Sequence, residues 1–129
     1  MKIVIVSGFF NPLHGGHLDM IEAGSQMGDK LVVIVNNDKQ AIAKKGKVIL
    51  DEKNRLRLIK ALRVVDDAFI AVDQDGTVIE SLKKAYEMYS EDDLVFANGG
   101  DRDSDKVTPE SDICHKLGIE MVYGVGGTE

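Results

Sequence analysis

The chain has 129 residues, of which 43% are hydrophobic and 29% are charged, and its formal net charge is -6. This size and apolar fraction predict one domain over residues 1–129 with a hydrophobic core that needs no disulfide or structural metal. The acidic balance argues against general binding to nucleic acid or to an anionic membrane. We expect a cytoplasmic protein, because there is one cysteine, no pattern typical of a signal peptide, and no apolar run of about 18 residues.

Short runs rich in β-branched residues alternate along the chain with segments of amphipathic spacing. In chain order, we predict strand 2–7, helix 16–27, strand 30–35, helix 51–62, strand 68–72, helix 77–89, strand 94–97, a helix opened by Thr108 and closed by Gly118, and strand 119–123. This alternation predicts an α/β, Rossmann-like fold with a five-stranded parallel sheet of order 3-2-1-4-5 and helices on both faces. Such sheets bind ligands beyond the carboxyl ends of their strands.

The loop after the first strand contains two histidines, His14 and His17, three residues apart at the start of a helix. That spacing puts both side chains on one side of the first turn. The N–H donors and partial positive charge of a helix N-terminus suit a phosphate group. A zinc site or structural histidines are the alternatives. Zinc would need further ligands, and the other candidates, Cys114 and His115, lie on a remote helix.

Residues 8–17 read G-F-F-N-P-L-H-G-G-H and resemble the signature G-x-F-D-P-x-H-x-G-H of the cytidylyltransferase-like nucleotidyltransferase family. The resemblance continues at Asn36-Asn37-Asp38, at Arg55, at Arg63-Val64-Val65-Asp66 and at Asn98-Gly99-Gly100-Asp101. It is strongest to small members such as glycerol-3-phosphate cytidylyltransferases and ADP-heptose-type adenylyltransferases. It implies transfer of CMP or AMP from CTP or ATP to a phosphorylated alcohol or sugar, with release of pyrophosphate and no covalent enzyme intermediate.

The resemblance also implies roles for individual residues. The catalytic residues would be His14, His17, Lys44 and Lys47. The nucleotide would contact Gly8, Phe9, Phe10, Asn11, Gly16, Asn98, Gly100, Asp101, Gly127 and Thr128. The phosphorylated acceptor would contact Asp38, Lys45 and Arg55. No protein ligand set for a metal is predicted, and magnesium is expected to arrive with the triphosphate. A homodimer is expected by resemblance, with Arg63 and Asp66 at the interface.

Alternative interpretations exist for the charged residues outside the first loop. The run Lys44-Lys45-Gly46-Lys47 is interpreted as a mobile basic loop for phosphates, although a run of lysines taken alone is more typical of a solvated surface. Arg55, near a helix start, could hold an acceptor phosphate with its fork of donors, or form a surface ion pair with Asp51 or Glu52. Asp101 could orient the nucleotide or a magnesium-bound water, or be an ordinary turn residue.

Two departures from the family pattern bear on activity. Asn11 stands where the family has an acid, and it keeps the acceptor oxygen without the charge. The family's second signature, I-S-S-T-x-x-R, would begin where residues 126–129 end the sequence, so its triphosphate clamp is not expected within these residues. A nucleotide-binding protein without turnover is therefore the alternative function. A dinucleotide-dependent oxidoreductase and a P-loop NTPase are disfavoured, because neither G-x-G-x-x-G nor G-x-x-x-x-G-K-[ST] is present.

Overall fold

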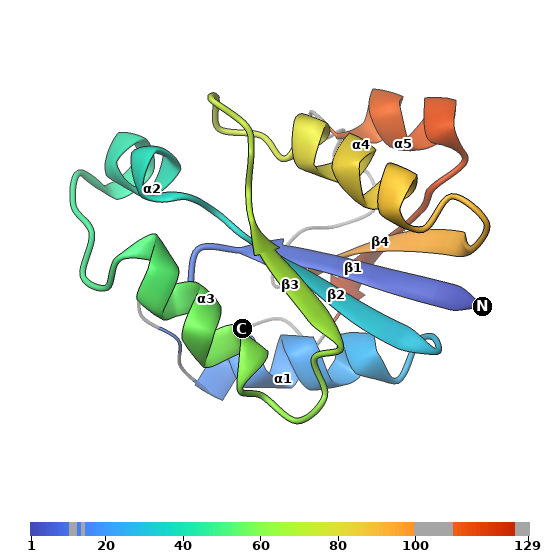
Figure 1. The fold of residues 1–129 in the computed structure, drawn as a ribbon, viewed down its shortest axis with the longest axis horizontal. Helices are drawn as coiled ribbons and strands as arrows, with labels where there is room; N and C mark the ends of the chain where they lie inside the picture. The colour runs from blue at the N-terminus through green and yellow to red at the C-terminus, as the bar shows by residue number, and fades with distance from the viewer. Residues whose placement is uncertain (11–12, 14, 100–109, 126–129) are drawn as a thin grey trace.

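Five parallel strands form one sheet in the computed structural model, which describes residues 1–10, 13, 15–99 and 110–125 (Figure 1). The elements are β1 (Lys2–Gly8), α1 (Gly15–Ser25), β2 (Lys30–Val35), α2 (Asp38–Lys45), α3 (Glu52–Lys60), β3 (Asp67–Ile70), α4 (Ile79–Met88), β4 (Asp93–Gly99), α5 (Ser111–Leu117) and β5 (Glu120–Val125). The strand order is β3-β2-β1-β4-β5, and every neighbouring pair is parallel. The predicted fold class and strand order are confirmed.

The two faces of the sheet carry separate parts of the core because successive side chains of a strand point to opposite faces. Ile3 and Ile5 of β1 pack in a cluster with residues of α4 and α5. Val4 and Val6 pack in a second cluster with residues of α1 and α3. The helices accordingly cover both faces of the sheet (Figure 1). All four of these β1 side chains are fully buried, which explains the continuous apolar run in the sequence.

Helix α2 was not among the predicted elements, and the interpretation of residues 44–47 as a loop is wrong for Lys44 and Lys45. Asn37 caps this helix by accepting the Gln40 N–H at 2.9 Å, and the Gln40 side chain accepts the Asn37 N–H at 3.0 Å. This reciprocal pair is a capping box. Gly46, in the left-handed conformation with φ 79°, ends the helix. Lys44 and Lys45 therefore belong to the last turn of a short helix.

Several helix ends were predicted for the right residues. Asp51 caps α3 by accepting the Asn54 N–H at 2.8 Å, and Gly118 ends α5. Helix α1 ends at Ser25, two residues before the predicted end of the helix at residue 27. A Cβ atom at Gly28 would lie 2.8 Å from the Lys2 carbonyl oxygen, so close packing against β1 explains this glycine better than helix termination. The predicted start of the last helix, at Thr108, lies outside the described residues.

No helix in the described part of the chain is long and apolar enough to cross a membrane.

Candidate active site

The segments that follow β1, β2 and β3 begin together at one edge of the sheet. The Asn36 N–H donates to the Gly8 carbonyl at 2.9 Å, and the Ala71 N–H donates to the Val35 carbonyl at 2.8 Å. These bonds extend the parallel pairing beyond β2 and β3. The start of the first loop at Phe9, the start of α2 and the segment after β3 therefore lie side by side at the carboxyl edge, where a parallel sheet of this kind binds ligands.

Phe10 joins the end of β1 to the first turn of α1. It has a left-handed φ of 52° and its side chain is 1% exposed. Its ring lies edge-to-face against the ring of His17, with 5.1 Å between the ring centroids. His17 is half-buried in the first turn of α1. The structure thus places one histidine of the predicted pair beside the end of β1, and His14 lies outside the described residues.

The Phe10 ring also accounts for Gly8. A Cβ atom at Gly8 would lie 2.7 Å from Cζ of Phe10, closer than van der Waals contact allows. The Phe10 ring is buried in the core and has little room to move. Because Gly8 has no side chain, it leaves the space that this ring occupies.

We expect Gly8→Ala to destabilise the protein by about 1–3 kcal/mol, the usual cost of overpacking a close contact. Displacement of the Phe10 ring should also disturb His17 and weaken nucleotide binding. Urea unfolding measures the first effect and calorimetry the second. Gly15→Ala is the matched control for stability, because a Cβ atom there meets nothing within 4 Å. If Gly8→Ala were as stable as the wild type, the Phe10 ring would be able to move away from a side chain at position 8, and this prediction would be wrong.

Lys44 brings the end of α2 to the first loop. Its ammonium nitrogen lies 4.9 Å from the centroid of the Phe9 ring, within the range of a cation–π contact. The Lys44 side chain is otherwise exposed, and so is that of Lys47 in the link between α2 and α3. Lys44 and Phe9, assigned from the sequence to phosphate and nucleotide, are therefore neighbours. The side chain of Lys45 is not described.

Among the described residues, Arg55 has the largest fully buried side chain, with 1% exposure for the residue. Its Nε donates to the Leu50 carbonyl at 2.8 Å, and its Nη1 donates to the carbonyls of Phe9 at 2.7 Å and Asn36 at 2.6 Å. Its Nη2 donates to Oδ1 of Asp38 at 2.7 Å. Four donated bonds use most of the five N–H groups of a guanidinium.

These contacts change the interpretation of Arg55. The surface ion pair considered with Asp51 or Glu52 is not formed, and the partner is Asp38, whose side chain is 34% exposed. In the structure, Arg55 links the first loop, the end of β2 and the start of α2 from beneath the surface. Direct contact between Arg55 and an acceptor phosphate stays a prediction, whereas Asp38 has a partly exposed carboxylate at the same edge.

Cys114 does not supply a nucleophile. Burial in α5 raises the pKa of its thiol to about 12, and the nearby Glu110 carboxylate acts in the same direction. The group is therefore a neutral thiol at physiological pH, and a neutral thiol is a weak nucleophile and metal ligand. Within residues 1–10, 13, 15–99 and 110–125, no group of three or more His, Cys, Asp or Glu side chains is placed to hold a metal ion.

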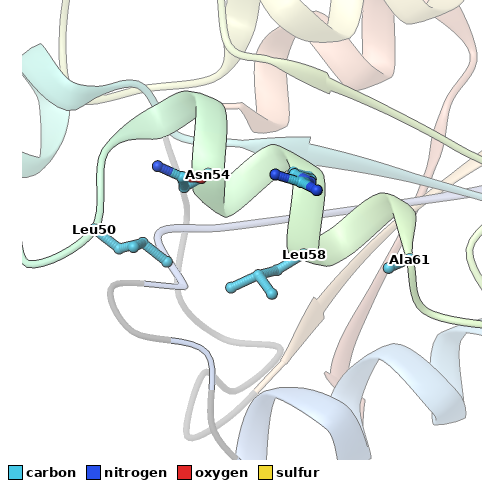
Figure 2. A pocket seen from close by; sticks show the side chains of 5 residues that line it. Leu50, Asn54, Leu58 and Ala61 are labelled. Atoms are coloured by element: carbon cyan, nitrogen blue, oxygen red, sulfur yellow. The ribbon is translucent and has the colours of Figure 1, made fainter.

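A shallow depression of about 380 Å³ lies on the outer face of α3 (Figure 2). It is lined by Leu50, Asn54, Arg57, Leu58 and Ala61. The helical residues among these share one face of α3, whereas Arg55 and Ile59 lie on the buried face. None of the predicted site residues lines this depression, so we do not assign it to substrate.

Several predicted residues cannot be placed. Outside the described part of the chain lie Asn11, His14, Gly100, Asp101, Gly127 and Thr128. Asn98 lies near the carboxyl end of β4, where its backbone continues the strand.

The sequence interpretation missed Gln40, which the N-x-x-Q spacing of a capping box at residues 37–40 could have revealed. It also missed Asp73, whose buried carboxylate accepts the N–H groups of Glu80 and Ser81, because no local motif marks that long turn.

The strand order is that of a Rossmann-like α/β protein. His17 and Lys44 lie at the carboxyl end of β1, where such proteins bind their ligands. The chain belongs to the cytidylyltransferase-like family, whose model matches residues 5–123. The family resemblance inferred from the first loop is thereby confirmed.

Individual relatives are consistent with this assignment. The FAD synthase of Ferroglobus placidus is 39% identical over 75 residues, which cover 58% of this chain and 49% of that protein. The bifunctional protein HldE of Desulfatibacillum aliphaticivorans is 30% identical over 129 residues, which cover 98% of this chain and 23% of that protein. A lipopolysaccharide core biosynthesis protein from Thermoplasma volcanium has a solved structure with a TM-score of 0.69, 31% identity and 95% coverage of both chains. The match thus spans about half the length of the FAD synthase and less of HldE.

Proposed function

We propose that this chain is a nucleotidyltransferase that moves AMP from ATP to a phosphorylated acceptor and releases pyrophosphate. The observation that carries the proposal is the meeting of two elements at the carboxyl edge of a family-typical sheet. His17, at the start of α1, contacts Phe10, and Lys44, at the end of α2, contacts the adjacent Phe9. A hydrogen-bond donor and a cation thus contact two adjacent residues just after β1.

ATP and FMN are the substrates that we favour. FAD contains AMP joined to FMN through a pyrophosphate bond, so a family member that makes FAD would transfer AMP from ATP to the FMN phosphate. FAD synthases from several archaea, including that of Ferroglobus placidus and that of Methanohalophilus mahii at 41% identity over 75 residues, support this choice. The CTP alternative has no comparable support from these relatives. A sugar phosphate is the second acceptor class, in keeping with the likeness to a lipopolysaccharide core biosynthesis protein.

In the proposed reaction, an oxygen of the acceptor phosphate attacks the α-phosphorus of ATP. The bond from that phosphorus to the β-phosphate bridging oxygen breaks, and pyrophosphate leaves. Negative charge builds on the non-bridging α-oxygens and on the leaving group. Donors fixed before the reaction stabilise such charge effectively. His17 would serve the α-oxygens, and Lys44 and Lys47 would serve the pyrophosphate. Magnesium would be held mostly by phosphate oxygens and water, as this ion prefers.

The deciding experiment crosses ATP and CTP with FMN, a sugar phosphate and glycerol-3-phosphate, and measures pyrophosphate release. We expect ATP with FMN to be the fastest pair and its product to be FAD by mass. Calorimetry with ATP in the absence of acceptor tests the alternative function, a nucleotide-binding protein without turnover. Tight ATP binding with no pyrophosphate release for any acceptor would favour that alternative and refute the proposal.

A further inference from the structure

Helix α2 lies beyond the carboxyl ends of β1 and β2 and stands apart from the helices that cover the two faces of the sheet (Figure 1). It carries Asp38, Lys44 and Lys45, to which the sequence assigns substrate contacts. Among its described side chains, only Gln40 and Ala41 are buried. So small an apolar surface gives little packing energy. The position of α2 must therefore depend largely on polar contacts.

Gln40 provides the densest of these contacts, and its side chain is almost completely buried at 3% exposure. Its Oε1 accepts from Nδ2 of Asn36 and from the Asn37 N–H, each at 3.0 Å. Its Nε2 donates to the carbonyls of Asp75 at 2.7 Å and Thr77 at 2.9 Å. Both ends of the amide are thus satisfied in one orientation only. The amide joins the end of β2, the start of α2 and the segment between β3 and α4.

The same helix turn connects Gln40 to the candidate active site. Gln40 and Lys44 are four residues apart, so they lie on one side of α2 with about 6 Å between them along the axis. The Lys44 ammonium lies over the Phe9 ring at 4.9 Å. Any tilt of α2 at Gln40 is therefore carried directly to the Lys44–Phe9 contact.

We propose that Gln40 is a positioning residue that holds α2 so that Lys44 lies against the first loop. The effect of Gln40 on turnover rests on the proposed function. Its effect on the position of the Lys44 side chain is independent of that function. Gln40 is buried among backbone groups and does not need to touch substrate. It acts through Lys44, whose charge is useful only where the phosphates of the nucleotide lie.

The first test requires no ligand. The ε-methylene protons of Lys44 lie near an aromatic ring, so their NMR signals should be shifted by the ring current of Phe9. Gln40→Glu keeps the acceptor oxygen but turns a carboxylate oxygen toward the carbonyls of Asp75 and Thr77. We expect this variant to lose the shift. Gln26→Glu, a matched change at an exposed position, should retain it. An unchanged Lys44 signal in folded Gln40→Glu would overturn the proposal.

The second test is a double-mutant cycle with Lys44→Ala. We expect Gln40→Glu to lower kcat/KM for ATP by about 10- to 100-fold, the scale of a small misplacement of a catalytic group. In the Lys44→Ala background, the same change should have little further effect, because the two residues act as one unit. Losses that multiply would show that Gln40 acts independently of Lys44 and would overturn the proposal. If the wild type binds ATP without turnover, the same cycle is read in the Kd for ATP.

Circular dichroism shows whether each variant folds. If Gln40→Glu does not fold, Gln40→Met, which is uncharged and of similar length, replaces it in both tests. Failure of both variants to fold would identify Gln40 as a residue needed for the fold itself and would overturn a specific positioning role.

Discussion

Replacing His17 with alanine is expected to lower kcat by about 100-fold or more, the usual effect of losing one preorganised donor to a transition state. The KM for ATP should change much less, because the donor acts chiefly on the charge that develops at the α-phosphate. His17 lies in the first turn of α1 and its ring contacts Phe10, which is buried in the core cluster that also contains Val4 and Val6 of β1. The donor is thus held by the core of the protein. Steady-state kinetics with ATP and the acceptor found in the substrate matrix measure the effect.

The matched control is His115→Ala, because His115 is an exposed histidine on α5. It should keep kcat within about twofold, as expected for a surface change remote from the site. His17→Ala also removes the ring that contacts Phe10, so the unfolding free energy of both variants must be measured. A folded His17→Ala protein with near-wild-type kcat would show that the histidine is structural, and the proposed chemistry would lose its donor.

Replacing Arg55 with methionine is expected to lower the free energy of unfolding by about 3–5 kcal/mol, the range for removing one partner from a buried charged network. The loss would leave the carbonyls of Phe9, Asn36 and Leu50 without their donor. Each such group costs about 1–3 kcal/mol if nothing replaces the bond. Asp38 is partly exposed, so water can hydrogen-bond to its carboxylate and reduce the cost of losing the bond to Arg55. Since domains of this kind are stable by only about 5–15 kcal/mol, the variant should unfold at much lower urea concentration.

Arg57→Met is the control for this prediction, because Arg57 is exposed on the outer face of the same helix. It should alter the unfolding free energy by no more than about 0.5 kcal/mol. If Arg55→Met were as stable as Arg57→Met, water or backbone rearrangement would have satisfied the orphaned carbonyls. The linking role that the structure gives Arg55 would then be wrong.

The amino-acid sequence by itself determined the architecture, because that information is local and periodic. Apolar β-branched runs such as 30–35 are buried strands of a parallel sheet, and their alternation with helices limits the strand order to few choices. Asp51 at the start of α3 and Gly118 at the end of α5 were recognisable for the same reason, since a cap acts within a few residues. The family signature in the first loop is likewise one contiguous segment.

The tertiary structure alone decided how the candidate site is held together. Arg55 reaches the Phe9 carbonyl across 46 positions of sequence, and Gln40 reaches those of Asp75 and Thr77 across 35 and 37. Nothing near Arg55 in the chain distinguishes a surface ion pair from a buried link. Helix α2 itself has local signals, the capping box of Asn37 and Gln40 and the glycine at position 46, but the contact of Lys44 with Phe9 joins distant parts of the chain and has none. Contacts between distant residues depend on how the strands bring them to one edge, and no local pattern encodes that meeting.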